Sequence, residues 1–540
     1  MSVEVGMATG SERPRPSGRT PSAALASRVR CRALLSRVAA AEDLVPLFED
    51  GMNVGWSGFG SNGNPKVVPR ALANHVEANG LQGKLRLGLF TGGSVAAEIE
   101  NRWAEVKLID RRFPYQLGDT IRRCVNDGTV RMGDKHLGLF AEDLLNGFYT
   151  KDRGGRLDLA IVEATAITEE GGIVLSTTAA AAPEIITIAE RVIVELNTAL
   201  PSFEGMHDIP VLRRPPFKQP YLITQVDDRI GTPHVPCPAE KIVAVVESQE
   251  ADNGPEMSPP DEISEQIAAN IVDFFEFEVK HGRLPKNLLA LQSGIGNIGN
   301  AVVAGVARAR FTGVPVWTEV IQDTMLDALE SGKMAFASTS GLALSNVGFR
   351  HLYDRWEFFR RKIVLRPQQI SNSAEVIRRI GVIGMNTPIE FDLYGHANST
   401  HANGTRLING IGGSGDFLRN SYLSIMHTPS VRATKADPTG ISCVVPMVPH
   451  VDHTEHDLHV VVTERGLADM RGLSPMERAQ LVIDRCAHPD YQPILQDYFD
   501  RARRECLPRA AGHIPHLLPK VFRMQQHLAE KGTMKIASWD

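Results

Sequence analysis

Short apolar runs alternate along the chain with glycine- and asparagine-rich turns and with segments whose apolar residues recur at helical spacing. The runs are Leu157–Glu163, Arg191–Glu195, Lys241–Glu247, Leu288–Ser293, Val314–Ile321, Lys362–Leu365 and Leu458–Thr463. A helix between two strands makes a crossover connection, and crossover connections join parallel strands. The pattern therefore predicts an α/β fold with a largely parallel sheet.

One polar stretch, residues 249–262 (QEADNGPEMSPPDE), divides the chain because it has three prolines, five acids and little to bury. The apolar residues after it predict a helix over Ile263–Val279 that Gly282 ends. We expect a disordered tail over 1–24, an N-terminal domain over 25–254, a C-terminal domain over 255–510 and a C-terminal extension over 511–540. A further helix is expected over Ala39–Phe48, and each domain contains one strand that feeds a glycine-rich turn.

The glycine-rich turn of the C-terminal domain, Gly294–Gly299, matches G-x-G-x-x-G between an apolar strand and the expected helix Ala301–Arg310. Such a turn exposes backbone N–H groups at a helix N-terminus, where they can bind a phosphate or stabilise a developing oxyanion. A dinucleotide site also needs an acid about 20 residues further on, and Glu319 meets that requirement. A dehydrogenase and a tight turn without a ligand therefore both remain open at this point.

Glu319 lies in a segment, Val316–Ile321, that we expect to be a single strand. Period-two alternation would place its carboxylate on the same face as Trp317 and Ile321, in apolar surroundings. Burial raises the pKa of a carboxyl group and strips its hydration, which suits a nucleophile or a proton shuttle. The alternative is an edge-strand glutamate paired with a nearby Arg or Lys.

Two successive segments, Tyr394–Gly404 and Asn409–Phe417, are too rich in Gly, Asn, Ser and His to form a hydrophobic core. Long loops inside compact domains are usually functional, and the glycines allow the backbone to approach a ligand closely. Ile408, Ile411 and Phe417 argue against a merely flexible loop. The histidines of His450–His459 could supply a metal site, but we expect them to line a cleft or stabilise a turn, and we expect no metal.

Composition excludes several classes of protein. Lys and Arg number 58 and Asp and Glu 63, for a net charge of −5, and the basic residues are interspersed, so we expect no nucleic-acid partner. No apolar run is long enough for a membrane span. The six cysteines form no C-x-x-C pair, which is typical of a reduced, intracellular protein. Arginines 28, 30, 32 and 37 resemble part of a mitochondrial transit peptide, but Glu4 and Glu12 oppose that reading. We expect a cytoplasmic protein, with the mitochondrial matrix as the alternative.

Several motifs in one order resemble the acetyl-CoA hydrolase/succinyl-CoA:acetate CoA-transferase family, particularly its fungal-type acetyl-CoA hydrolases. They are Leu291–Ile298, Trp317–Asp323, Asn409–Phe417, Val451–Asp457 and Gly466–Pro475, and the likeness runs from Leu25 to Ala529–Lys535. The resemblance implies a class I CoA-transferase, with two related CoA-transferase-type α/β domains around an interdomain active-site cleft. It also implies a homodimer, and no metal or nicotinamide cofactor.

The resemblance assigns roles residue by residue. Glu319 is the expected nucleophile, which forms an acyl-glutamyl anhydride and then a glutamyl-CoA thioester. The backbone N–H groups of Ile295 and Gly413 are the expected oxyanion donors, Asn372 the active-site amide and Glu464 an acid of the cleft. The expected coenzyme A contacts are Gly294, Ile295, Gly296, Asn297, Ile298, Ile389, Asn409, Gly413 and Lys435.

Two departures from the family pattern concern substrate preference more than reaction class: Arg465 stands where Gln is usual, and Asn62–Lys66 differs from the common Gly-x-Pro-Lys. The expected substrates are acetyl-CoA or succinyl-CoA with acetate, succinate or propionate as the carboxylate. Water as the acceptor would make the same enzyme an acetyl-CoA hydrolase. A metallohydrolase and a CoA-binding sensor without catalysis are further alternatives.

Overall fold

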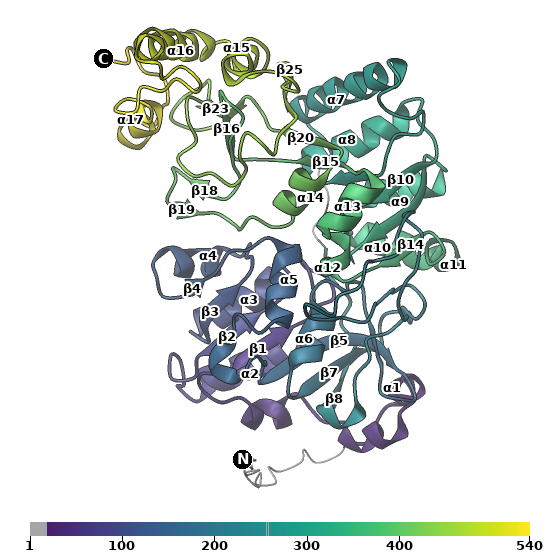
Figure 1. The fold of residues 1–540 in the computed structure, drawn as a ribbon. Coiled ribbons are helices and arrows are strands. Elements are labelled where there is room, and N and C mark those ends of the chain that lie inside the picture. The colour runs from purple at the N-terminus through teal and green to yellow at the C-terminus, as the bar shows by residue number, and fades with distance from the viewer. Residues whose placement is uncertain (1–18, 255, 257–258) are drawn as a thin grey trace, which may run out of the picture.

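The computed structural model describes residues 19–254, 256 and 259–540. These residues form two α/β halves, one below the other in Figure 1, and helices α5, α12 and α14 lie where the halves meet. Each half is built around its own largely parallel sheet. The predicted α/β class is therefore confirmed, and all seven predicted apolar runs contain strands.

The first sheet has the strand order β4-β3-β2-β1-β5-β7-β8, with β6 antiparallel to β5 and every other pair parallel. Its strands are β1 (Asn53–Trp56), β2 (Leu87–Phe90), β3 (Ile109–Phe113), β4 (Arg131–Met132), β5 (Leu159–Ile167), β6 (Ile173–Leu175), β7 (Val192–Asn197) and β8 (Ile242–Ser248). Both faces are buried: Leu159 and Ile161 enter one core, while Ala160 and Val162 enter the other. Such two-sided burial explains why β5 begins with an unbroken apolar run, Leu159–Val162.

The second sheet has the order β14-β12-β10-β9-β15-β20-β24-β25, and only the β24–β25 pair is antiparallel in this described sheet. Its strands are β9 (Leu291–Ser293), β10 (Val314–Trp317), β12 (Met334–Thr339), β14 (Ile363–Leu365), β15 (Ile383–Asn386), β20 (Leu423–His427), β24 (Val460–Thr463) and β25 (Gly466–Asp469). The carboxyl ends of β9, β10 and β15 therefore lie side by side, and chain order changes direction there. Open parallel sheets bind ligands at such a place.

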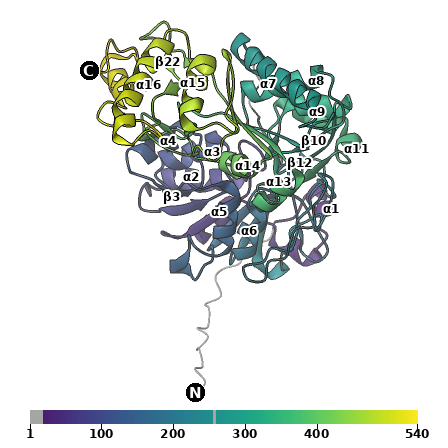
Figure 2. The same cartoon turned by 45° about the horizontal axis from the view of Figure 1, so that its top comes forward.

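Helices cover the sheets and are joined to them by short turns. Those of the first half are α1 (Ala23–Arg28), α2 (Val67–Ala78), α3 (Ala97–Glu105), α4 (Asp119–Asn126), α5 (Leu137–Leu145) and α6 (Ala182–Ile188). Those of the second half are α7 (Glu262–Lys280), α8 (Asn297–Arg308), α9 (Asp323–Glu330), α10 (Asn346–Asp354), α11 (Trp356–Phe359), α12 (Gln368–Ser371), α13 (Ala374–Ile380), α14 (Ser414–Asn420), α15 (Pro475–Cys486), α16 (Gln492–Cys506) and α17 (Arg523–Lys531). Figures 1 and 2 both place α15 and α16 at the end of the second half opposite α11.

The helix predicted after the polar stretch is confirmed as α7. The Asp261 side chain accepts a hydrogen bond from the Ser264 amide at 2.7 Å, which caps the first turn. Gly282, with φ of +71°, follows the last turn in the left-handed conformation that glycine adopts without strain. The divide near residue 255 thus falls between β8 and α7, beside residues that the structure does not describe.

Three expectations about local structure need correction. Ala39–Phe48 contains a 3₁₀ helix (Glu42–Leu47) rather than an α-helix, because Pro46 removes one backbone donor. Residues 1–18 of the expected tail lie outside the described part, whereas Arg19 donates its amide to the Val38 carbonyl at 2.8 Å and α1 begins at Ala23. The remaining 3₁₀ helices are Arg32–Arg37, Lys151–Arg153, Ala239–Lys241 and Leu507–Arg509.

The third correction concerns Tyr394–Gly404, which is not structureless. Short strands run through it and its surroundings: β16 (Glu390–Asp392), β17 (Ala397–Asn398), β18 (His401–Ala402), β19 (Arg406–Leu407), β21 (Val431–Arg432), β22 (Ile441–Ser442) and β23 (Val444–Val445). Residues 511–540 pack onto the same region, where Met524 and Trp539 are buried in its core. Two remaining strands, β11 (Val320–Ile321) and β13 (Gly341–Leu342), pair with each other.

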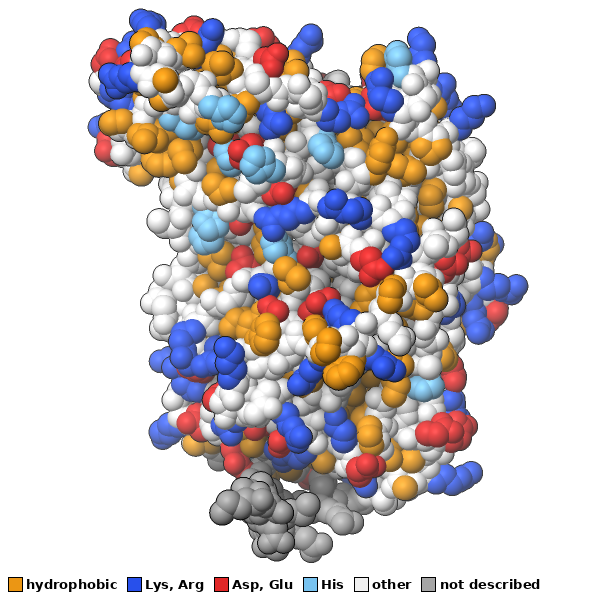
Figure 3. All heavy atoms as spheres, in the orientation of Figure 1, with side chains coloured by type: hydrophobic (Ala, Val, Ile, Leu, Met, Phe, Trp, Pro, Cys, Tyr) orange, Lys and Arg blue, Asp and Glu red, His pale blue; other side chains and the backbone are white. Residues whose placement is uncertain are grey.

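On the face shown in Figure 3, Lys and Arg are interspersed with Asp and Glu. Among the described residues, no helix combines the length and the apolar character that crossing a membrane requires.

Candidate active site

Glu319 lies at a bend and not within a strand, which corrects the expected strand Val316–Ile321. Strand β10 ends at Trp317, and β11 begins at Val320 and pairs with β13 instead of continuing in the sheet of β10. The Glu319 carbonyl accepts hydrogen bonds from the amides of Ser340 (3.0 Å) and Gly341 (3.2 Å) and from Oγ1 of Thr339 (3.0 Å). These three hydrogen bonds hold the bend. The Glu319 side chain is therefore placed at the carboxyl end of β10.

The Glu319 carboxylate is half-buried and accepts a hydrogen bond from Nδ2 of Asn372 at 2.7 Å. Burial raises the pKa of this carboxyl group to about 7, against the opposing effect of the Asn372 hydrogen bond, and the nearby Asp416 raises it further. A carboxyl group with such a pKa is poorly solvated yet substantially ionised near neutral pH. Both properties suit a nucleophile or a base.

Asn372 follows helix α12, and its amide is held from both ends. Oδ1 accepts from Oγ of Ser371 at 2.7 Å, and Nδ2 donates to Asp416 at 3.1 Å as well as to Glu319. The Ser371 carbonyl in turn accepts from the Trp317 indole at 2.7 Å. The strand that precedes Glu319 and the turn that carries Asn372 are thereby fastened to each other.

Gly413 lies in the segment Asn409–Phe417, just before α14, and packs against the other two site residues. A Cβ atom at this position would overlap Oε1 of Glu319 and would lie 2.5 Å from Nδ2 of Asn372. Its φ of −91° is open to any residue, so the requirement for glycine is steric. The structure thus brings together Glu319, Asn372 and Gly413, which lie far apart in the chain.

The turn Gly294–Ile298 lies at the carboxyl end of β9, the strand next to β10. Gln322, just beyond β11, braces it: its Nε2 donates to the Gly294 carbonyl and its Oε1 accepts from the Gly296 amide, both at 3.3 Å. Helix α8 begins at Asn297, four residues earlier than expected, because Gly296 turns with φ of +130°. The Ile295 side chain is 57% exposed. Within the described part of the chain, the backbone N–H groups of Ile295 and Gly413 have no acceptor.

The first half contributes residues that the sequence did not indicate. Nδ2 of Asn409 donates to Oη of Tyr115 at 3.1 Å, and the two carboxylate oxygens of Asp134 accept from the Ile411 amide at 2.9 and 3.0 Å. Burial is the main cause that raises the pKa of Tyr115 to about 12, and Glu319 adds to it. No local pattern marks Tyr115 or Asp134, because their partners lie almost 300 positions away.

Other predicted residues lie away from Glu319. Glu464 stands after β24, four strands from β10, which is about 19 Å at the usual strand spacing, and it accepts from the Ser430 amide at 2.8 Å. Ile389 is half-buried beyond β15, and Lys435 is exposed and has no hydrogen-bond or ion-pair partner among the described residues. Ile389 follows β15, two strands from β10, and is therefore nearer to Glu319 in the strand order than Glu464.

Two histidines of the His450–His459 segment, His453 and His459, contact neighbouring elements, whereas the His456 side chain is exposed. His453 is buried with Nε2 3.2 Å from Oγ of Ser414, and Nδ1 of His459 accepts from the Ser424 amide at 3.2 Å. No group of three or more His, Cys, Asp or Glu residues in the described part of the chain is arranged to hold a metal ion.

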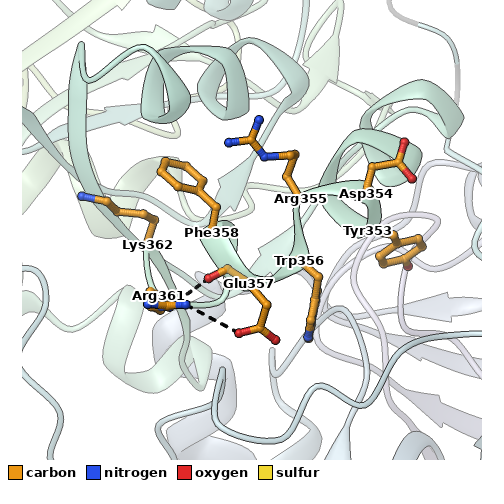
Figure 4. A pocket seen from close by; sticks show the side chains of 8 residues that line it. All are labelled: Tyr353, Asp354, Arg355, Trp356, Glu357, Phe358, Arg361 and Lys362. Atoms are coloured by element: carbon orange, nitrogen blue, oxygen red, sulfur yellow. Dashed lines mark hydrogen bonds and ion pairs between the residues drawn. The ribbon is translucent and has the colours of Figure 1, made fainter.

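A cavity of about 590 Å³ opens between the halves and reaches the far side of Asn372. Its lining includes His136 and Glu142 beside α5, Asp416 and Arg419 of α14, and Lys218. A separate hollow of about 620 Å³ lies over α10 and α11 (Figure 4). There, Glu357 faces Arg361, and Arg355 lies beside the Phe358 ring. None of the residues that line this hollow belongs to the site around Glu319.

Comparisons with known proteins found matches along most of the chain. The model of the acetyl-CoA hydrolase/transferase N-terminal domain matches residues 24–247, and that of the C-terminal domain matches residues 348–499. The acetyl-CoA hydrolase of Schizosaccharomyces pombe is 53% identical over 95% of this chain and 99% of its own, and that of Eremothecium gossypii is 54% identical over 96% and 100%.

Solved structures resemble the chain in fold. RipA from Yersinia pestis matches 86% of this chain and 98% of its own, with a TM-score of 0.66 and 22% identity. A 4-hydroxybutyrate CoA-transferase from Porphyromonas gingivalis matches 86% and 97%, with a TM-score of 0.58 and 20% identity.

Proposed function

The chain belongs to the acetyl-CoA hydrolase/transferase family and is an enzyme, and from this premise we propose that it transfers CoA through a thioester on Glu319. The observation that carries the proposal is the half-buried Glu319 carboxylate, which is hydrogen-bonded to Asn372 and closed over by Gly413. Two backbone N–H groups without acceptors, those of Ile295 and Gly413, flank this region. A nucleophile beside preorganised donors is the arrangement that acyl transfer requires.

In the proposed reaction, a Glu319 oxygen attacks the acyl-CoA carbonyl and displaces the CoA thiolate, which gives an acyl-glutamyl anhydride. The thiolate then attacks the glutamyl carbonyl and expels the carboxylate product, which carries away one oxygen of Glu319. The resulting glutamyl-CoA thioester is opened by an acceptor carboxylate in the reverse order of steps. Asn372 holds the carboxylate in place between these events.

Each attack creates an oxyanion, and we assign its stabilisation to the N–H groups of Ile295 and Gly413. Removal of one preorganised donor of this kind typically costs about 2.7–4 kcal/mol of barrier. Both donors are backbone groups. The two glycine-rich turns therefore contribute through their backbone conformation and not through their side chains.

We propose that coenzyme A lies along the edge of the second sheet, from the turn Gly294–Ile298 past Asn409, Gly413 and Ile389 toward Lys435. The exposed Lys435 ammonium suits a phosphate as a point charge. Glu464, at the same edge, contacts the bound substrate at a place away from the carbonyl carbon that reacts. Acetyl-CoA or succinyl-CoA is the proposed donor, and acetate, succinate or propionate the proposed acceptor.

A second candidate function is direct thioester hydrolysis, in which Glu319 is a general base that activates water. The raised pKa of Glu319, about 7, favours this role as well. The curated relatives carry the name acetyl-CoA hydrolase, so the two mechanisms need a decisive experiment.

The origin of the oxygen in the product separates the two mechanisms. In a single turnover of acetyl-CoA by excess enzyme in H₂¹⁸O, the thioester route yields unlabelled acetate, because its new oxygen comes from Glu319. Hydrolysis of the thioester then leaves ¹⁸O in the Glu319 carboxylate, which a mass shift of the peptide reports. Direct hydrolysis instead yields labelled acetate and an unlabelled peptide, and that result would refute the thioester.

The remaining proposals follow from the family and the sequence. We propose two domains that divide near residue 255, a homodimer, and a cytoplasmic location with the mitochondrial matrix as the alternative. We further propose that the reaction needs neither a metal nor a nicotinamide.

A further inference from the structure

Asp416 is a buried carboxylate that has no role in the proposed reaction. It is 7% exposed, and burial raises its pKa to about 7. Among the described residues it has no ion pair with an Arg or Lys, and the nearest guanidinium on its own helix, Arg419, instead contacts Asp457 at 3.2 Å. A buried carboxylate without a cationic partner is costly, so its contacts need an explanation.

One contact of Asp416 is with the amide that holds Glu319. Nδ2 of Asn372 has two hydrogens, and one is donated to Oε1 of Glu319 and the other to Oδ2 of Asp416. If the amide were turned over, Oδ1 of Asn372 would face both carboxylates and the hydrogen bond to Glu319 would be lost. With Asp416 present, only the observed orientation satisfies all three groups.

The other contact of Asp416 reaches across the interface to helix α5 of the first half. The Gly138 amide, in the first turn of α5, donates to Oδ2 of Asp416 at 3.0 Å, and the Leu137 amide donates to the Gly412 carbonyl at 3.2 Å. Helix α5 has no acid in its first turn and no side-chain cap of its own. The carboxylate from the second half therefore caps it, at the helix end where negative charge is favoured.

We propose that Asp416 is a positioning residue that orients the Asn372 amide toward Glu319. Asp416 is itself held by its hydrogen bond from the first turn of α5, and this cap forms only when the two halves are in contact. The inference rests on the proposed role of Glu319. It explains why a carboxylate is buried at this point, since a cap alone is supplied equally well by Ser, Thr or Asn.

A double-mutant cycle tests the proposal on the full chain. The variants are Asp416→Ala, Asn372→Ala and the pair, and the measurement is the rate of CoA-adduct formation on mixing with acetyl-CoA, followed by intact-protein mass spectrometry. Asp416→Ala is expected to slow adduct formation about 10- to 100-fold, the range for a lost hydrogen bond to a charged group. Because Asp416 acts through Asn372, the double variant is expected to be no slower than Asn372→Ala alone.

Asp416→Asn separates positioning from loss of structure, because an asparagine retains an acceptor for both Asn372 and Gly138. Its adduct rate is expected to stay close to wild type, with the acid limb of its pH profile displaced to lower pH. The displacement follows because a negative charge near Glu319 is removed. The other titratable or charged groups that face Asp416 are Glu142 of α5, His136 just before α5 and Arg419 of α14, and they are unchanged in this variant.

Glu142→Gln is the matched control, since it removes a negative charge near Asp416 without touching Asn372; its salt bridge is with Lys218. It is expected to leave the adduct rate unchanged. Wild-type rates in Asp416→Ala, or effects of Asp416 and Asn372 that multiply in the double variant, would overturn the proposal. Absence of an adduct in the wild type would count against the proposed function instead, and the same cycle would then be read on acetyl-CoA consumption.

Discussion

Gly413 faces the carboxylate of Glu319 so closely that a single added methyl group would overlap Oε1. The two residues lie on different elements, a bend after β10 and the turn before α14, and Asn372 is hydrogen-bonded to the same oxygen. The position that carries an unpaired backbone N–H is thus pressed against the proposed nucleophile. Close packing of this kind leaves no room for adjustment without moving one of the three segments.

Gly413→Ala is therefore expected to disrupt the Glu319–Asn372 hydrogen bond. We expect kcat/KM for acetyl-CoA to fall about 100-fold or more, as for the loss of an oxyanion donor. Steady-state kinetics with a thermal unfolding curve measure the effect. Gly305→Ala in helix α8 is the matched control, because its Cβ would lie 3.3 Å from the Val272 side chain at the nearest; it should retain activity. Full activity of Gly413→Ala would contradict the close approach.

The pH dependence of the reaction should follow the Glu319 carboxyl group. Its pKa is raised to about 7, and only the ionised form attacks an acyl carbon. Adduct formation is thus expected to be constant above that pH and to fall about tenfold per unit below it. A rapid-quench profile between pH 5 and 9 measures the limb. A flat profile down to pH 5 would show that Glu319 titrates as an ordinary surface glutamate.

The same shift predicts how stability depends on pH. A carboxyl group whose pKa rises on folding stabilises the native state below its unfolded pKa, near 4.5, and this contribution is lost as pH rises through the folded value of about 7. Glu319→Gln resembles the protonated form at every pH. Its free energy of unfolding relative to wild type should therefore increase from pH 5 to pH 8, by at most about 3 kcal/mol.

Urea unfolding at the two pH values measures this difference, with Glu375→Gln on the surface of α13 as the control. An equal difference at pH 5 and pH 8 would mean that the Glu319 carboxyl group is not perturbed by the fold.

Lys435 offers a test of the proposed CoA path. Because the ammonium is exposed and its proposed partner is a phosphate of coenzyme A, Lys435→Ala should raise KM for acetyl-CoA about fivefold, the scale of one exposed charge pair, and leave kcat unchanged. The increase should shrink as salt is added. Lys84→Ala, in the first half, serves as the control. A lower kcat with an unchanged KM would place Lys435 in the chemistry rather than in binding.

Most of the fold could be predicted because two-sided burial leaves a local record. Burial produces a local sequence pattern: it is visible as the apolar runs of β5, β7 and β8 and as the helical spacing of apolar residues in α7. The strand expected around Glu319 failed for a non-local reason: β11 leaves the sheet of β10 because it pairs with β13, about 20 residues later in the chain.

The candidate site was predicted in part. Gly413 and Asn409 lie in a segment whose composition argued against a core role, and Gly294 lies in the turn that matches G-x-G-x-x-G. Tyr115 and Asp134 were not indicated, and Asp416 was given no role although it lies within Asn409–Phe417. Their importance arises from contacts between the halves, such as the hydrogen bond from Asn409 to Tyr115 across 294 positions. Such contacts leave no periodicity in a single sequence.

The most direct test of the central claim is to trap the covalent intermediate. The purified chain is mixed with excess acetyl-CoA and quenched, and a portion is reduced with borohydride; intact-protein and peptide mass spectrometry then follow, beside Glu319→Gln. The account predicts a mass increase equal to CoA on the wild type alone, localised to Glu319 and removed by added acetate. Consumption of acetyl-CoA by the wild type without any adduct on Glu319 would contradict it.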